Sequence, residues 1–308
     1  MAAPAHYTAA TNFGANVLTT VYLQTMFEEA NKRDFVVYPL GKVAALPEKM
    51  GKTVRWNRMA MPAVLSALTE DDPTTVTLTT TTVTSTLLDY GASYPYSRFL
   101  EMTAIQDTIP EIVSTAGYQF GLTCETVCYS SALTDATQID AGVAMTADTL
   151  RTAVSTLDGL DAIKHPQAKA LGGRYCAVFS PEQAYDMMGE GAPTWWQAKN
   201  NQVEATFQTP WDGTPAASML YGTFIKTSTV VTTQSASSEE FGYVIGGAAF
   251  GTVSLGQGNP LSPRVVITTP EQRVDRAARD QGSIGTWGLF SAEMLNGNNL
   301  REIKSDIT

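Results

Sequence analysis

The chain has 308 residues, enough for two ordinary domains or one large irregular one, and its 44% apolar content can bury a core, so a disordered protein is excluded. Charged residues are only 16%, whereas threonine occupies 41 positions, so much of the polar surface must be hydroxyl or backbone. The 30 acidic and 20 basic residues give a net charge of −10, which argues against tight nucleic-acid binding and leaves loose contact with DNA open.

The first 40 residues are expected to form an arm and a helix. Residues 1 to 15 are small and polar without a period, which is typical of a mobile arm. From Asn16 to about Arg33 apolar residues recur at helical spacing, and Asp34 is expected to start an extended stretch that runs to Pro39.

A long hairpin is predicted next. Thr53–Met59 alternates in polarity, and Thr74–Thr86 has nine threonines in thirteen positions, so both segments are predicted strands around an exposed tip at Ala60–Pro73. Thirteen strand residues extend about 43 Å at about 3.3 Å each, and few of these side chains are apolar enough to pack on their own body. We therefore expect a partner to cover this arm, because an uncovered edge promotes aggregation.

The strongest helix signal runs from about Thr108 to Leu133, with Pro110 in the first turn and Glu111 placed favourably for the helix dipole. At about 1.5 Å per residue the helix would be close to 37 Å long, enough to serve as a backbone for the subunit. One stripe is predicted to be its core face: Ile109, Ile112, Val113, Ala116, Phe120, Cys124, Val127 and Cys128. The two cysteines are interpreted as small buried hydrophobes.

Beyond Asp140 short helices and strands alternate. Thr146 is predicted to cap a helix that stops at the Asp158-Gly159 turn, and Ser180-Pro181-Glu182-Gln183 forms a capping box that starts another helix. The predicted strands are Tyr175–Phe179, Gly222–Ile225, Tyr243–Val253, Arg264–Ile267 and Ser283–Phe290, with a last extended piece after the Asn296-Gly297 turn.

Residues for catalysis, cofactor binding or metal binding do not occur in a usable pattern. Gly51-Lys52-Thr53 lacks the first glycine of a phosphate-binding loop, because Leu46 stands there, and the chain has no G-x-S-x-G. The only histidines and cysteines are His6, His165, Cys124, Cys128 and Cys176. Their spacing fits neither a redox C-x-x-C nor a four-ligand zinc site, so we predict no enzyme activity, no cofactor and no metal.

Neither a secretory signal nor a membrane span is expected. The first basic residue is Lys32, so the start lacks the charged region of a signal peptide. The uncharged stretch Phe241–Pro263 contains six glycines and is predicted to form strands and turns. Three cysteines make no disulfide framework and suit a reducing cytosol.

Six short segments occur in an order that is hard to obtain by accident: Gly51–Arg58, Leu68–Glu70 with Pro73, Leu87–Gly91, Val178–Gln183, Tyr221–Ile225 and Gly282–Phe290. Over residues 15 to 304 the chain thereby resembles the major capsid proteins of tailed bacteriophages with the Hong Kong 97 coat fold, and it looks closest to the branch found in N-four-like phages.

The resemblance implies an α+β fold with the domains of that coat protein. It places an N-terminal arm and helix at 1–40, an extended β-hairpin called the E-loop at 41–90, and a P-domain with the long spine helix at 91–139. An A-domain at 140–260 and the return strands of the P-domain at 261–308 complete the expected chain.

The implied function is self-assembly into hexamers and pentamers of an icosahedral shell around double-stranded DNA, in a virion assembled in the host bacterial cytoplasm. Implied partners are a portal, a separate scaffolding protein, a possible decoration protein and non-specifically contacted DNA, with no membrane. Two alternatives remain open: an encapsulin-like nanocompartment shell, and a Thr-rich soluble enzyme or binding domain.

Candidate contacts between subunits follow from the same resemblance: Arg55, Arg58, Glu70, Asp71, Asp72, Trp195 and Trp196. The acidic group is either a solvated tip or a salt-bridging patch, and the tryptophans are expected to pack in the core or at an interface. Some relatives also join subunits through a self-catalysed bond between a hairpin Lys and an Asn. Between Thr53 and Pro73 this chain has no Lys, and Arg cannot supply the neutral amine, so we expect non-covalent shells.

Overall fold

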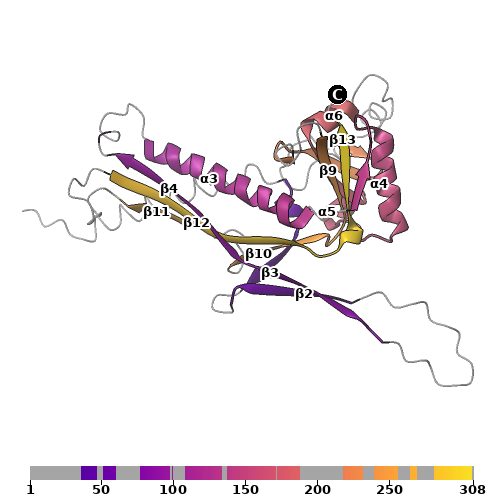
Figure 1. Ribbon diagram of the computed structural model, residues 1–308, viewed down its shortest axis with the longest axis horizontal. Coiled ribbons are helices and arrows are strands. Elements are labelled where there is room, and N and C mark those ends of the chain that lie inside the picture. The colour runs from indigo at the N-terminus through magenta and orange to yellow at the C-terminus, as the bar shows by residue number, and fades with distance from the viewer. Residues whose placement is uncertain are drawn as a thin grey trace, which may run out of the picture.

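The computed structural model describes residues 36–46, 51–59, 77–97, 99, 108–133, 137–170, 172–187, 218–231, 239–255, 264–268 and 281–306. The arm and helix expected before residue 34, the acidic group Glu70 to Asp72, and the pair Trp195 and Trp196 lie outside these residues. The described elements form a long sheet, a second sheet and a two-stranded hairpin (Figure 1).

The long sheet is organised around one strand of 14 residues. Its strands are β1 (Lys42–Leu46), β10 (Phe250–Leu255), β12 (Gln281–Met294) and β11 (Arg264–Thr268) in this order, and β4 (Leu88–Ser97) also pairs with β12. β1 runs parallel to β10, and the other pairs are antiparallel. Alternate residues of β12 from Gly282 to Phe290 are buried, as expected for a strand with one face on a core.

The long helix α3 (Thr108–Val127) lies along this sheet and continues directly into a π-helical turn, η2, at Cys128–Leu133 (Figure 1). The predicted end of the helical segment at Leu133 is confirmed. The ring of Phe120 packs against Gly288 of β12, where an added Cβ would collide with it. The absence of a side chain at Gly288 therefore sets how closely α3 approaches the sheet.

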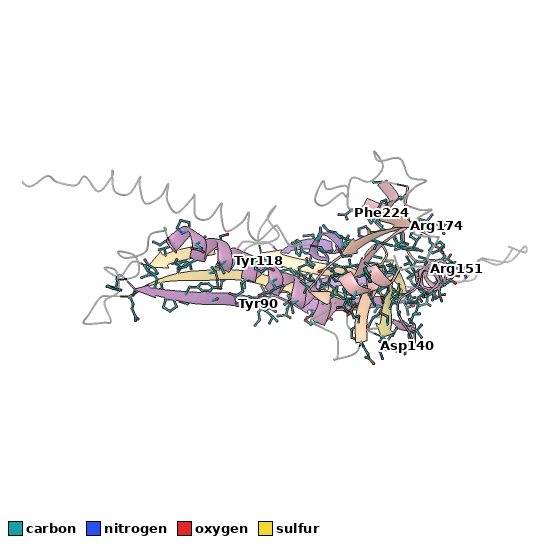
Figure 2. The ribbon with its side chains drawn as sticks, turned by 90° about the horizontal axis from the view of Figure 1, so that it is seen from above. Tyr90, Tyr118, Asp140, Arg151, Arg174 and Phe224 are labelled. Atoms are coloured by element: carbon teal, nitrogen blue, oxygen red, sulfur yellow. The ribbon has the colours of Figure 1, made fainter. Side chains whose placement is uncertain are left out.

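The second sheet has six strands. In order they are β5 (Thr137–Asp140), β13 (Leu300–Asp306), β9 (Glu239–Ile245), β6 (Tyr175–Phe179), β8 (Thr223–Thr227) and β7 (Ser218–Leu220). The helices α4 (Ala147–Gly159), α5 (Pro166–Ala170) and α6 (Pro181–Met187) belong to this unit. In Figure 2 Asp140, Arg151 and Arg174 lie on it, whereas Tyr90 and Tyr118 lie on the unit built by the long sheet and α3.

Both predicted helix caps are confirmed. The Thr146 hydroxyl accepts from the Thr149 N–H at 3.3 Å, and the Ser180 hydroxyl accepts from the Gln183 N–H at 3.0 Å. The second half of the capping box differs, because the Gln183 amide does not return to Ser180. It donates instead to the Glu240 carbonyl at 3.1 Å and to the Ser305 hydroxyl at 2.9 Å, and so ties α6 to the sheet.

Two local predictions are wrong. The segment Tyr243–Val253 is not one strand, because a turn at Gly246–Ala249, with Ala248 at a φ of 52°, sends β9 and β10 into different sheets. The stretch expected to stay extended to Pro39 instead forms a 3-10 turn, η1 (Tyr38–Leu40). The sequence does not predict strands β1 and β4. Hydropathy does not alternate clearly along the Ala-rich segment that forms β1 or along the Tyr- and Ser-rich segment that forms β4.

Each of the two sheets draws strands from distant parts of the chain. β10 belongs to the long sheet although it falls within 140–260, and β13 belongs to the second sheet although it falls within 261–308. The chain therefore crosses between the units more than once, through the turn before β10 and through the short 3-10 helix η6 (Gly297–Asn299) before β13.

Candidate assembly surface

The hairpin has little packing of its own in the described chain. β2 (Thr53–Met59) pairs antiparallel with β3 (Thr80–Thr86), in register from Thr53 opposite Thr86 to Met59 opposite Thr80, which confirms the predicted hairpin. It extends away from both sheets (Figure 1). Most of its side chains are exposed, and the run of threonines on β3 supplies hydroxyls instead of apolar surface.

The base of the hairpin is anchored on the long sheet. Val54 and Trp56 pack against a small buried cluster of Leu46, Leu87 and Val253. The hydroxyls of Ser85 and Ser291 lie 2.5 Å apart in a buried hydrogen bond, and the Leu87 N–H donates to the Lys52 carbonyl at 2.8 Å. These contacts fix the direction of the hairpin while its outer part stays exposed.

The two hairpin arginines occupy different environments. Both are exposed on β2, and the Arg58 guanidinium donates to the Asn296 side-chain oxygen of its own body. Arg58 therefore helps to set the angle of the hairpin, whereas Arg55 lies on its exposed surface. Two large apolar side chains of the hairpin region are also exposed, Met59 by 69% and Leu78 by 57%.

The residues of the predicted helix stripe line the interior between α3 and the long sheet. Val113, Ala116, Phe120, Cys124 and Cys128 are each at most 5% exposed, and Ile109, Ile112 and Val127 are partly buried against the same core. Burial raises the pKa of the Cys124 and Cys128 thiols, so both stay protonated at neutral pH and are not nucleophiles.

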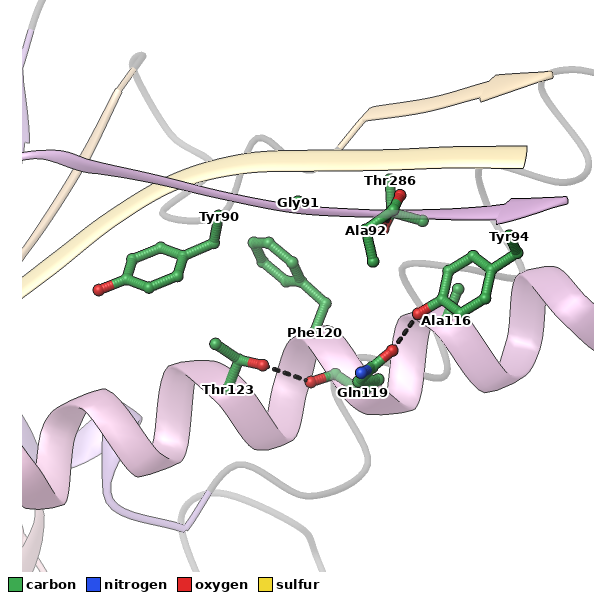
Figure 3. A pocket seen from close by; sticks show the side chains of 9 residues that line it. All are labelled: Tyr90, Gly91, Ala92, Tyr94, Ala116, Gln119, Phe120, Thr123 and Thr286. Atoms are coloured by element: carbon green, nitrogen blue, oxygen red, sulfur yellow. Dashed lines mark hydrogen bonds between the residues drawn. The ribbon is translucent and has the colours of Figure 1, made fainter. Parts of the chain in front are cut away.

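A shallow cavity of about 110 Å³ lies between β4 and α3 (Figure 3). It is lined by Tyr90, Gly91, Ala92, Tyr94, Ala116, Gln119, Phe120, Thr123 and Thr286. The Tyr94 hydroxyl donates to the Gln119 side-chain oxygen across its mouth. The lining residues carry no charged group, so this cavity offers neither an acid–base pair nor a ligand set for a hard metal ion.

The remaining chemical candidates in the described residues have structural partners. The His165 ring is buried against the Leu40 carbonyl, and burial lowers its pKa. Burial raises the pKa of the Cys176 thiol to about 12. No group of three or more metal-binding side chains comes together in the described part of the chain, and none of its helices is long and apolar enough to span a membrane.

Solved structures match this architecture, although no family model and no curated protein matches the sequence. The capsid of cyanophage Pam1 is 10% identical with a TM-score of 0.62, covering 90% of this chain and 93% of that chain. The capsid of Ralstonia phage GP4 is 10% identical with a TM-score of 0.61, covering 90% and 92%. A virus-like particle from Pyrococcus furiosus is 9% identical with a TM-score of 0.52, covering 92% and 99%.

At these identities the comparisons establish the fold. The chain has the α+β coat fold of Hong Kong 97 type, as predicted, because the matches extend over most of both chains. The long helical segment Thr108–Leu133, made of α3 and η2, is the segment predicted to be the spine helix.

Proposed function

We propose that this protein is the major coat subunit of a tailed phage, of the branch found in N-four-like phages, and that it assembles into hexamers and pentamers of an icosahedral shell. The hairpin carries the proposal. It is anchored at its base through Trp56 and Ser85, yet it extends with exposed threonines, Met59 and Leu78. A surface of this kind gains stability when a neighbouring subunit covers it.

Closed assembly also explains how individually weak contacts are sufficient. Each subunit of a ring or shell touches several neighbours at once, so the contacts reinforce one another through effective concentration. Arg55 on the exposed surface of β2 is proposed to contact a neighbouring subunit, together with the acidic residues Glu70, Asp71 and Asp72 and the pair Trp195 and Trp196. Arg58 would act mainly by holding the hairpin at its angle.

The proposed partners follow from this role. The shell would enclose double-stranded DNA by non-specific contact, which the net charge of −10 favours because strong binding would oppose genome release. A portal, a separate scaffolding protein and a possible decoration protein would complete a virion assembled in the bacterial cytoplasm. The expected domain ranges, from the arm at 1–40 to the return strands at 261–308, form part of the same proposal.

A nanocompartment shell is the second candidate. The likeness to the Pyrococcus furiosus virus-like particle favours it, because that particle shares the fold over 99% of its own chain. A nanocompartment would be built by this chain alone around a cargo protein, and a phage head would need a portal vertex to package DNA.

Expression of the chain alone, followed by cryo-electron microscopy of the purified particles, tests the proposal. We expect closed icosahedral shells in which the hairpin of one subunit lies on its neighbour. A monomer that persists at high protein concentration would contradict assembly altogether. In particles isolated from infected cells, a unique portal vertex and DNA would indicate a phage head, whereas a portal-free shell filled with one protein would indicate a nanocompartment.

A further inference from the structure

Five residues, Val36–Leu40, lie between the two units of the molecule and are held by side chains from both. They include Val36, Val37 and the short turn η1. Val37 is fully buried and Leu40 is 3% exposed, so the segment is part of the core. Because η1 has no side-chain cap of its own, its backbone groups depend on partners from elsewhere in the chain.

The N–H groups of this segment are bound by one carboxylate. Glu125, fully buried on α3, accepts from the Val36 N–H at 2.9 Å and from the Tyr38 N–H at 3.1 Å through Oε1. Both of its oxygens accept from the Val37 N–H, at 3.1 and 3.0 Å. Glu125 thus caps η1 from a helix that is almost ninety residues away in the sequence.

The carbonyl groups of the same segment are bound from the second unit. His165 Nε2 lies 3.0 Å from the Leu40 carbonyl, and the Gln167 amide donates to the Pro39 carbonyl at 3.2 Å. A carbonyl only accepts, so Nε2 of His165 carries the proton. The backbone N–H of His165 donates to the Arg174 carbonyl at 2.8 Å. This bond connects His165 to the second sheet just before β6.

We propose that Val36–Leu40 is a latch between the spine helix and the second sheet. Glu125 from one unit and His165 with Gln167 from the other hold opposite sides of the same five residues. A change in the relative orientation of the two units would break the hydrogen bonds on one side of this segment, in addition to contacts of the core that both units share, such as the packing of Tyr129 against Tyr243. This inference rests on contacts within one subunit and does not depend on the proposed shell.

The two sides of the latch respond to pH in opposite directions. Burial raises the pKa of Glu125 to about 7, although the three N–H donors and the charge of Lys226 on β8 act to lower it. The other titratable groups that face Glu125 stay neutral because burial raises their pKa values: Cys124, Cys128, Tyr38 and Tyr129. When the segment is released, the carboxyl of Glu125 returns to its ordinary pKa of 4.5. The closed latch therefore binds the proton more strongly than the released state, so protonation favours closure. Closure weakens as the pH rises and the carboxyl loses its proton, which is complete above about pH 7.

Burial lowers the pKa of His165 from its ordinary value of 6.5, with the Leu40 carbonyl acting against that shift. A released imidazole binds a proton more readily than the buried ring. The carbonyl side therefore weakens as pH falls below about 6.5.

Hydrogen–deuterium exchange of the Val36, Val37 and Tyr38 amides measures the latch directly. Glu125→Leu removes every acceptor, and we expect the protection of these amides to fall at least tenfold, whereas the control Glu111→Gln, at an exposed position of the same helix, leaves it unchanged. Glu125→Gln keeps one acceptor and removes the titration. In the wild type, protection corrected for intrinsic exchange should fall between pH 6.5 and 8.5, and in Glu125→Gln it should not.

Coupling between the units is measured with spin labels on Tyr118→Cys of α3 and Tyr185→Cys of α6, which are 49% and 75% exposed and belong to different units. Glu125→Leu should release the segment and thereby broaden the distribution of distances between the two labels. If that variant does not fold, the wild type at pH 8.5 takes its place in this measurement. Unchanged amide protection in both arms would overturn the latch. Lost amide protection with an unchanged distance distribution would show that releasing the segment does not change the relative orientation of the two units. That result would overturn the proposed coupling between the units.

Discussion

The indole of Trp56 packs directly on the backbone of Gly251, and a Cβ added at Gly251 would lie 2.9 Å from the ring. This close approach joins the hairpin to β10 of the long sheet, and it is possible only because position 251 has no side chain. The orientation of the proposed assembly arm is thus set by one aromatic residue and one glycine that lie almost two hundred residues apart.

Replacing that glycine should disturb assembly more than folding. Gly251→Val is expected to displace Trp56 and tilt the hairpin, so the yield of closed shells should fall sharply while the circular dichroism of the subunit stays that of a folded protein. Gly285→Ala on β12 is the matched control, because its added Cβ would meet only the Val266 carbonyl oxygen at 3.7 Å. Shells of normal yield and shape from Gly251→Val would contradict this account of the hairpin.

Removing the hairpin should leave a folded subunit. Deletion of Lys52 to Thr86 with a short Gly-Ser link is geometrically easy, since the Leu87 N–H already bonds to the Lys52 carbonyl at the base. We expect a soluble, helical, monomeric protein that builds no stable shell, measured by circular dichroism and analytical ultracentrifugation. Loss of soluble protein would instead place the hairpin in the subunit's own core.

The spine helix should be sensitive to the loss of packing on its buried face. Phe120→Ala is expected to lower the free energy of unfolding by about 3 to 5 kcal/mol, because the ring is 5% exposed and fills the space over Gly288. Cys124→Ser should cost less, and the exposed Tyr118→Ala on the same helix should change stability by no more than about 0.5 kcal/mol. Urea denaturation of the three variants makes the comparison.

The pH dependence of stability should carry the signature of Glu125. Its pKa is raised to about 7 in the folded chain from 4.5, so its contribution is present below pH 4.5 and is lost as pH rises through 7, by up to about 3 kcal/mol. The wild-type free energy of unfolding, minus that of Glu125→Gln, should therefore fall between pH 5 and 8. A difference that stays flat over this range would mean that the carboxyl is ionised throughout.

Assembled particles should contain no covalent link between subunits. Boiled in detergent and reductant, they are expected to give a single band near 33 kDa, because no lysine lies between Thr53 and Pro73. A ladder of dimers, pentamers and hexamers would show that a lysine at the hairpin base, such as Lys52, reaches an acceptor after all.

Local signals in the sequence were sufficient for the elements that depend on neighbouring residues. The helix stripe from Ile109 to Cys128, the caps at Thr146 and Ser180, and the alternation in Thr53–Met59 each follow from spacing along the chain, and each element formed where it was predicted. The order of these elements, with the resemblance it carries, was also enough to predict the coat fold. These features are local, so the residues that specify them lie within one helix turn or one strand of each other.

Tertiary structure decided what depends on residues far apart in the chain. The split of Tyr243–Val253 into two sheets, the pairing of β4 with β12, and the capture of Val36–Tyr38 by Glu125 leave no local trace, because each depends on a partner that the chain brings back from a distance. A glutamate on a helix otherwise predicts a solvated charge, and only its burial beside three N–H groups shows that it is a cap. Burial and long-range hydrogen bonding are properties of the folded chain as a whole, and they determine where the hairpin is anchored and where it extends.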